Sequence, residues 1–396
     1  MIQHFVSIAL LVFVSAWATI SQQYPALKIP IAIPIETRVA VSEITPSVTP
    51  PQLDTTIETL FPPQETESPE APKPFPEETE PTPLPPLTVP TPPIPVEEPA
   101  TEPTEENPVV QDVDKDASLE ALLKSAVVNI ICIPGGGLRG SSGTGIVVDP
   151  RGIILTVAHV GQNFLVLDYP KVGAGKCYIR TGSPAKNAYL AKLIYISPQW
   201  VDDNSTILIE SRPKGTGEND FAFLAITDSL TNKPLPRSFS YIPFAKPNTL
   251  VEVDDRVGVG SYAAEFLTSS EVRSSLYPTI SFAPVDDIYT FEETTRDVIS
   301  VHAGAAAQEG SSGGAVINED GELVGLISTR TVKPDLSLRD LQAISVDHIR
   351  RSFKDYVSVN LDAYMKNNSL ETLVTAFSMT AKNLGEKIIS AINDAQ

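Results

Sequence analysis

The chain has 396 residues and a net charge of −20, and its 36 prolines lie mostly between Pro25 and Pro108. Seventeen acids and two lysines between Glu43 and Asp116 carry most of that charge, which indicates a solvated, self-repelling segment. These features exclude a basic footprint for nucleic acid, and they leave one block, from about Ser118 onward, for a single substantial core.

The first segment, Phe5 to Ile20, is apolar and uncharged, which is typical of an export signal. Ala16-Trp17-Ala18 fits a small-x-small cleavage site, which would make residues 1–22 a removable signal peptide. Left uncut, residues 5–20 would be a membrane anchor, although they are fewer than the roughly 20 residues that span a bilayer. Either way, the sequence predicts an exported protein of the cell envelope or extracellular space, tethered to the membrane or released after cleavage near Ala18.

Residues 23–117 are predicted to be a disordered linker rich in Pro, Glu and Thr. Proline fixes φ and removes a backbone donor, so neither helix nor sheet propagates through such a segment. In the polyproline form it extends by about 3.1 Å per residue. It is either a stalk that holds a domain away from a surface or a generic linker.

The block over residues 118–358 has the pattern of one all-β domain. A short amphipathic helix is expected from Ser118 to Lys124, followed by a strand over residues 127–133. Strands over 142–148 and 153–159 are joined by a Pro-Gly turn, and short apolar runs separated by turn signals continue to about residue 347. This pattern is typical of a β-sandwich or barrel.

Two polar residues stand at the ends of apolar runs. His159 ends the run 153–158, where its ring can face a cleft, and Asp220 opens the run 221–226. A carboxylate at the mouth of a core strand needs a hydrogen-bond donor, and a histidine ring N–H can supply it. Asp202 and Asp203 are rival acids, but they lie in a polar stretch that we interpret as a solvent loop.

The segment over residues 308–316, Q-E-G-S-S-G-G-A-V, is the strongest motif. A serine nucleophile needs backbone N–H groups aimed at the oxyanion that develops on its substrate. We expect Gly310 to let its peptide turn inward beside the N–H of Ser312, and Gly313 and Gly314 to keep side chains away from the substrate. A flexible Gly/Ser loop is the alternative interpretation of this motif taken alone.

In chain order, T-V-A-H, N-D-F-A-F-L and G-S-S-G-G-A-V resemble the trypsin-like serine proteases, and most closely the bacterial Deg/HtrA-type group. The resemblance covers roughly residues 127–357. It implies an all-β fold of two six-stranded antiparallel β-barrels, here with an N-terminal disordered linker and a C-terminal helix. It also implies a nucleophile at Ser312, a general base at His159, a tautomer-fixing carboxylate at Asp220, and an oxyanion hole from the N–H groups of Gly310 and Ser312.

This chain departs from the family in three places. Ser311 stands where digestive members have Asp and Deg-type members usually have Asn, so activation by zymogen cleavage is not expected. No PDZ domain is expected after the barrels, because only 84 residues follow Ser312. Ala306 stands where trypsin itself has an acid, so a preference for Arg or Lys is not expected. We expect Ser328, Thr329 and Arg330 to form a pocket wall and the pocket to take a small or medium aliphatic residue. Alternatively, Arg330 narrows the pocket or meets an acidic group.

The cysteines and the C-terminal tail leave two questions open. Cys132 and Cys177 either form one disulfide, worth about 4 kcal/mol by the loop-entropy relation, or remain separate buried thiols. Residues 359–396 form a helical tail capped by Ser369, whose apolar face either packs on the protease domain or contacts a partner, a second copy or a membrane surface.

These observations predict an exported serine endopeptidase that cleaves polypeptide substrates through an acyl-enzyme intermediate. The four histidines have no acidic partners at metal-binding spacing, so no metal and no cofactor are expected. The resemblance suggests protein quality control in the cell envelope, and the oligomeric state stays open. The alternative is a catalytically silent surface or binding protein that retains the protease fold.

Overall fold

The structure is a computed structural model that describes residues 108–133, 135, 140–167, 175–210, 217–291, 294–331, 335 and 338–395. The predicted export segment over residues 5–20 and the linker up to residue 107 lie outside the described residues. Within the described ranges, no helix is both long and apolar enough to cross a membrane.

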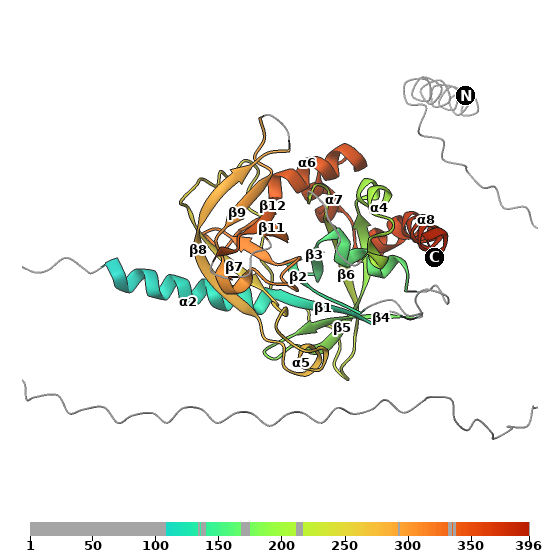
Figure 1. Cartoon of the computed structure of the whole chain (residues 1–396), viewed down its shortest axis with the longest axis horizontal. Coiled ribbons are helices and arrows are strands. Elements are labelled where there is room, and N and C mark those ends of the chain that lie inside the picture. Colours follow the sequence, from blue (N-terminus) through green and yellow to red (C-terminus); the bar gives the residue numbers. More distant parts are fainter. Residues whose placement is uncertain are drawn as a thin grey trace, which may run out of the picture. The chain divides into compact units, whose positions relative to one another are not determined.

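The described strands form two closed barrels of six strands each, and every strand pair is antiparallel (Figure 1). The strands of the first barrel are β1 (Val127–Ile133), β2 (Ser141–Asp149), β3 (Ile153–Thr156), β4 (Lys176–Thr181), β5 (Lys186–Ile196) and β6 (Ala222–Ser229). Those of the second are β7 (Arg256–Ser261), β8 (Thr279–Tyr289), β9 (Val298–Val301), β10 (Ala315–Ile317), β11 (Leu323–Arg330) and β12 (Leu341–Ser345). The neighbours run β1-β2-β3-β6-β5-β4 in one barrel and β10-β11-β12-β9-β8-β7 in the other, which confirms the predicted fold.

Branched apolar residues, which suit a pleated, half-buried surface, form the core of both barrels. Ile130, Ile146 and Ile154 are fully buried in the first, and Val259 and Val316 in the second. One-turn helices lie in the connections between strands: α3 (Ala158–Gly161), η1 (Gln162–Leu165), α4 (Pro198–Asp203), η2 (Ile207–Ile209), α5 (Ser269–Ser274) and η3 (Gly304–Ala306).

Helix α2 (Pro108–Ala126) leads into β1 and begins earlier than the predicted start at Ser118. Proline is favoured at the first helical position because its missing N–H would have no intrahelical acceptor there. The helix buries Leu119 and Leu123 and packs on β7 of the second barrel. A Cβ on Gly260 of β7 would lie 2.8 Å from Leu123 Cδ2, so this glycine makes room for the leucine.

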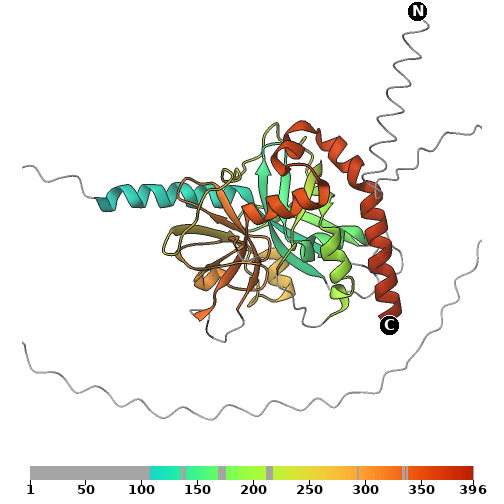
Figure 2. The same cartoon turned by 90° about the horizontal axis from the view of Figure 1, so that it is seen from above.

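Three helices follow the barrels: α6 (Val346–Val357), α7 (Leu361–Asn367) and α8 (Leu370–Ala395). The Ser369 hydroxyl accepts the Thr372 N–H at 3.1 Å, as expected of a cap. Helix α8 packs on β5 and η1 of the first barrel. The centroids of its Phe377 ring and of the Tyr195 ring lie 5.9 Å apart. Figures 1 and 2 show α2 and α8 on different sides of the paired barrels. Packing on the protease domain is therefore the alternative that the structure supports for the tail.

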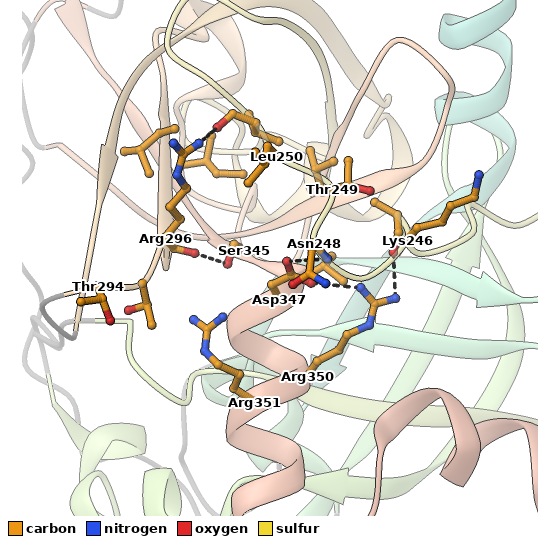
Figure 3. A pocket seen from close by; sticks show the side chains of 17 residues that line it. Lys246, Asn248, Thr249, Leu250, Thr294, Arg296, Ser345, Asp347, Arg350 and Arg351 are labelled. Atoms are coloured by element: carbon orange, nitrogen blue, oxygen red, sulfur yellow. Dashed lines mark hydrogen bonds and ion pairs between the residues drawn. The ribbon is translucent and has the colours of Figure 1, made fainter.

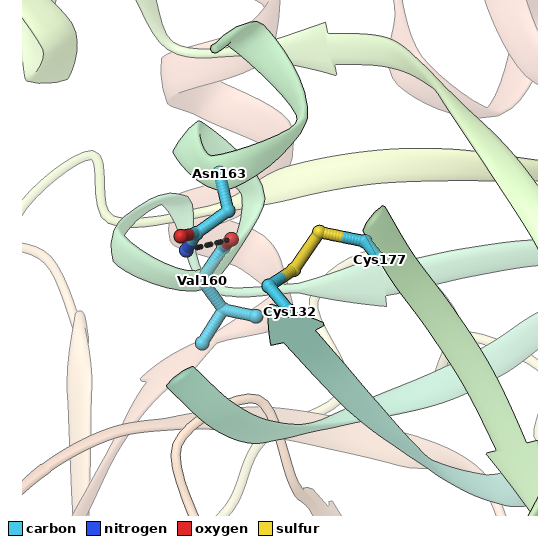
Figure 4. Close-up of a disulfide and its surroundings, with 4 residues drawn as sticks. All are labelled: Cys132, Val160, Asn163 and Cys177. Carbon is cyan, nitrogen blue, oxygen red and sulfur yellow. Dashed lines mark hydrogen bonds between the residues drawn. A yellow bond between two sulfur atoms is a disulfide. The ribbon is translucent and has the colours of Figure 1, made fainter. Parts of the chain in front are cut away.

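Cys132 and Cys177 form a disulfide between the end of β1 and the start of β4 (Figure 4). The two residues are direct partners in the β1–β4 ladder, which brings their side chains to the same face of the sheet. Val160 of α3 and Asn163 of η1 lie beside the bond, and the Asn163 amide donates to the Val160 carbonyl at 3.0 Å. Of the two alternatives left by the sequence, the structure has the disulfide.

Candidate active site

His159 lies in α3, directly after the first barrel's β3. The predicted strand over residues 153–159 is too long, because β3 ends at Thr156 and the chain turns into a four-residue helix at Ala158. This turn presents both the backbone N–H and the ring of His159 to one carboxylate. Asp220 Oδ1 accepts the backbone N–H at 2.9 Å, and Asp220 Oδ2 lies 2.9 Å from ring Nδ1.

Asp220 reaches His159 from a turn just before β6. Its backbone N–H donates to Gly217 O at 3.1 Å, and its side chain is 5 % exposed. The carboxylate accepts two hydrogen bonds from His159 and a third from the Ser328 hydroxyl at 2.7 Å. Burial by itself raises the pKa of Asp220, but the charge of His159 and these hydrogen bonds outweigh burial and hold that pKa below its usual range.

The same pair controls the protonation of the histidine. Burial disfavours the charged ring, whereas the charge of Asp220 and its hydrogen bond favour it, and the net effect raises the pKa of His159 above its ordinary value. Because Nδ1 donates to Asp220, the neutral ring keeps the lone pair of Nε2 free to accept a proton. The side chain is 32 % exposed, so solvent and ligands can reach the ring.

Ser312 comes from the second barrel, in the turn between η3 and β10. Thr144 of β2 donates its N–H to Ser312 O at 2.8 Å, which holds this turn against the first barrel. The Ser312 hydroxyl donates to Ser328 O at 3.3 Å, so Ser328 contacts Ser312 through its carbonyl and Asp220 through its hydroxyl. Among the described residues, no hydrogen bond joins Ser312 directly to His159, and such bonds often tighten only when substrate is present.

Two backbone N–H groups beside Ser312 are available to a ligand. Ala264 donates its N–H to Glu309 O at 2.7 Å. In a trans peptide the C=O and the following N–H point in opposite directions, so the Gly310 N–H points away from Ala264. Within the described ranges, neither this N–H nor that of Ser312 has a protein acceptor. The predicted pair of oxyanion donors is therefore unoccupied by protein groups.

The structure gives a further reason for the glycine after Ser312. Gly313 has a φ of +90°, and a Cβ there would lie 1.9 Å from Thr144 O. A side chain at Gly313 would therefore prevent this close approach between the two barrels, and the expected clearance for a substrate stays a prediction. Gly310 has a φ of +93°, and a Cβ there would lie 2.6 Å from Tyr262 O, which supports the predicted need for glycine at this turn.

The four residues that the sequence assigned to a substrate pocket each contact other groups of the protein. Ala306 is fully buried, and its carbonyl accepts the Ser311 hydroxyl at 2.6 Å. Ser328 serves Asp220 and Ser312, as described above, and Thr329 donates to Gln342 at 2.9 Å. Arg330 Nη2 lies 3.3 Å from Glu265 and 3.5 Å from Glu309, so this arginine meets acidic groups of the protein.

Sequence reasoning missed the contacts of Ser328, Thr144 and Glu265 in this region. Each of them contacts a residue of the motifs that lies far away in the sequence. No sequence pattern around Ser328, Thr144 or Glu265 indicates these contacts. Asp202 and Asp203, the rival acids, end helix α4 and do not lie in a loop; Asp202 pairs with Lys387 of α8.

A family model described as a trypsin-like peptidase domain matches residues 143–326, a range that contains His159, Asp220 and Ser312. This part of the chain is a trypsin-like peptidase domain. The match confirms the resemblance that the sequence motifs indicated. No curated protein matches the chain.

Two solved structures are similar to the peptidase domain in fold. One is Deg5, with 15 % identity and a TM-score of 0.39, covering 61 % of this chain and 93 % of that chain. The other is the Rv3671c protease from M. tuberculosis in its active form, with 17 % identity and a TM-score of 0.38, covering 65 % of this chain and 92 % of that chain.

The peptidase domain also has a cavity of about 280 Å³ at the start of α6, lined by none of the predicted catalytic residues (Figure 3). Arg296, Arg350 and Arg351 line it, but each already has an acidic partner. These partners are Glu252 for Arg296, Asp347 and Asp362 for Arg350, and Asp297 for Arg351. Lys246 also lines the cavity and has no acidic partner among the described residues, so the cavity offers an anion at most one uncompensated positive charge.

Proposed function

We propose that the protein is an exported serine endopeptidase with Ser312, His159 and Asp220 as its catalytic triad. The observation that carries this proposal is the Asp220 carboxylate, which binds both the backbone N–H and ring Nδ1 of His159 while Ser328 connects it to Ser312. A histidine held in this way is oriented and restricted to one tautomer, as a general base must be.

In the proposed reaction, His159 Nε2 takes the hydroxyl proton of Ser312 as Oγ attacks the scissile carbonyl. Asp220 stays ionised, keeps the other proton on Nδ1, and stabilises the imidazolium. The N–H groups of Gly310 and Ser312 bind the oxyanion. The imidazolium then protonates the leaving amine as the C–N bond breaks, and the acyl group remains on Ser312. A water molecule deprotonated by His159 releases the acid and restores the serine.

Export is the proposed setting of this reaction. The apolar stretch Phe5–Ile20 supports it, and so does the Cys132–Cys177 disulfide, because disulfides persist in oxidising compartments outside the cytoplasm. Misfolded envelope proteins would then be within reach as substrates. Mass spectrometry of the mature chain distinguishes a signal peptide cut near Ala18 from an uncut anchor.

A small or medium aliphatic residue is the proposed preference before the cut. The ion pairs of Arg330 with Glu265 and Glu309 support this, because they engage the acidic groups that would otherwise attract a basic substrate side chain. A cleavage profile on an unbiased peptide library tests it, and a dominant preference for Lys or Arg at that position would contradict it.

Labelling of the active serine tests the enzyme proposal. A fluorophosphonate probe is expected to react with the wild-type protein at Ser312, and Ser312→Ala is expected to remove both the label and peptidase activity. Loss of a triad nucleophile typically lowers kcat by about 10⁶-fold. Circular dichroism and thermal unfolding show whether each variant is folded. A folded wild type that stays unlabelled would show that the protein is a silent member of the fold.

A further inference from the structure

Glu265 lies at the centre of a charged cluster next to the turn that carries Ser312. Its carboxylate is 2.7 Å from Arg339 Nη1 and 3.3 Å from Arg330 Nη2. The side chains are 19 % exposed for Glu265, 7 % for Arg339 and 17 % for Arg330, so solvent screens these pairs only partly. Burial raises the pKa of Glu265, but the Arg339 hydrogen bond and the two positive charges outweigh it and keep the pKa low.

Residues 264 and 265 together hold residue 309 at both of its backbone groups. The Glu309 N–H donates to Glu265 Oε2 at 3.3 Å, and the Glu309 carbonyl accepts the Ala264 N–H at 2.7 Å. Arg339 Nη1 also donates to Ala307 O at 3.3 Å, so the same cation contacts both Glu265 and the chain before the turn. The Ala264 contact holds the peptide whose N–H belongs to Gly310, and the Glu265 contact holds the peptide before it, so together they restrict φ and ψ of Glu309.

The Glu309–Gly310 peptide needs external contacts to keep one orientation. Glycine has more freely accessible backbone conformations than other residues, so a peptide next to Gly310 can rotate more easily than most. The Glu309 side chain is 75 % exposed and therefore gives the turn little packing of its own. If the peptide rotated, the Gly310 N–H would no longer point where an oxyanion forms, while Ser312, His159 and Asp220 could stay in place.

We propose that Glu265, held by Arg339, is a positioning residue that fixes the orientation of the Glu309–Gly310 peptide and thereby the oxyanion hole. The inference rests on the proposed function, because an oxyanion hole matters only to an acyl-transfer enzyme. It assigns to Glu265 a role in the rate of the chemical step. Arg330, which belongs to the proposed substrate pocket, keeps Glu309 as a partner at 3.5 Å when the Glu265 charge is removed, so KM is expected to change little. The proposal therefore predicts how kcat and KM should respond separately.

Glu265→Gln tests the proposal, because it removes the charge and keeps the size of the side chain. Loss of one oxyanion donor typically lowers kcat by about 100- to 1000-fold, and a donor that is only misoriented part of the time should lower kcat by about 10- to 100-fold. KM on a fluorogenic peptide should change little, and the rate of fluorophosphonate labelling at Ser312 should fall by a similar factor. Glu252→Gln is the matched control, since Glu252 also pairs with an arginine, Arg296, at 2.9 Å.

The result that overturns the inference is wild-type kcat and labelling in a folded Glu265→Gln variant. If that variant does not fold, Glu265→Asp keeps the charge, draws the carboxylate back by one methylene, and should also lower kcat without raising KM. A crystal structure of the variant gives a readout independent of activity, because the Glu309–Gly310 peptide should be rotated; an unchanged peptide contradicts the proposal. If wild type is unlabelled, the proposed function fails, and this crystal structure still tests the role of Glu265 in the turn.

Discussion

At the scale of single residues, two opposing effects decide the charge of the His159–Asp220 pair. Burial disfavours charge on both groups, whereas their mutual attraction and hydrogen bonds favour it. The charge of His159 and the three hydrogen bonds to Asp220 outweigh burial, lower the pKa of Asp220 and keep it an ionised carboxylate. The histidine consequently holds a proton more tightly than a free imidazole, which makes it a stronger base.

The raised pKa of His159 predicts that peptidase activity decreases as the pH falls below neutral. In the proposed mechanism only neutral His159 accepts the serine proton, so kcat/KM should fall as the pH drops through a His159 pKa that lies above the ordinary value of about 6.5. Asp220→Asn removes the charge that raises this pKa, so the His159 pKa should decrease, and kcat should fall by about 10⁴-fold. NMR titration of the ring, made in the Ser312→Ala background, measures both pKa values. A His159 pKa that is the same with and without the Asp220 charge would contradict this account.

At the scale of elements, strand β2 holds the turn that carries Ser312 through one residue. Thr144 donates its N–H to Ser312 O at 2.8 Å and its hydroxyl to Gly310 O at 2.8 Å. Its own carbonyl accepts the Thr156 hydroxyl at 2.7 Å, and it lies against the space where Gly313 has no side chain. The serine of the second barrel is thus positioned by a strand of the first barrel.

Gly313→Ala should break this contact. The added Cβ would lie 1.9 Å from Thr144 O at a φ of +90°, so the backbone must move, and we expect a loss of about 3 kcal/mol or more in the free energy of unfolding. Gly304→Ala is the control, because Gly304 also has a positive φ, +48°, with no atom within 4 Å of the added Cβ. Gly304→Ala should lower the free energy of unfolding by only about 1 kcal/mol. Equal losses in urea unfolding would show that backbone strain alone, and not the approach to Thr144, is responsible.

Some of these elements and contacts could be predicted from the sequence, and others could not. Short apolar runs separated by turn signals were enough to predict an all-β sandwich or barrel, whereas the two six-stranded barrels followed only from the family resemblance. The motif order was enough to place His159, Asp220 and Ser312 as candidates. The end of β3 could not be predicted, because a one-turn helix such as α3 has no period of its own and continues an apolar run. The contacts of Ser328 and Glu265 join residues far apart in the chain, so no local pattern indicates them. The pairing of two cysteines likewise depends on the β1–β4 register.

At the scale of the whole described domain, helices from its two ends cover different barrels. Helix α2 packs on the second barrel, and α8 packs on the first. The buried face of α8 is formed by Leu373, Phe377, Leu384, Ile388 and Ile392. The tail is therefore part of the folded domain and contributes to its stability.

Two substitutions on α8 should separate packing on the domain from a role as a contact surface. Phe377 is 7 % exposed and lies near Tyr195, so Phe377→Ala should lower the free energy of unfolding by about 3–5 kcal/mol. Met379, two residues further on, is 68 % exposed, and Met379→Ala should change it by less than about 0.5 kcal/mol. Chemical denaturation measures both. If Met379→Ala were the more damaging variant, the exposed face would be the one that is covered in solution.

The disulfide has a consequence for an enzyme that digests polypeptides. The β1–β4 pairing completes the ring of the first barrel, and Cys132–Cys177 fastens that pairing covalently. When the two strands separate transiently, the bond keeps their ends together, so they rejoin faster than untethered strands would. Because peptidases cleave locally unfolded chain, we expect the disulfide to slow the cleavage of one molecule of this protein by another.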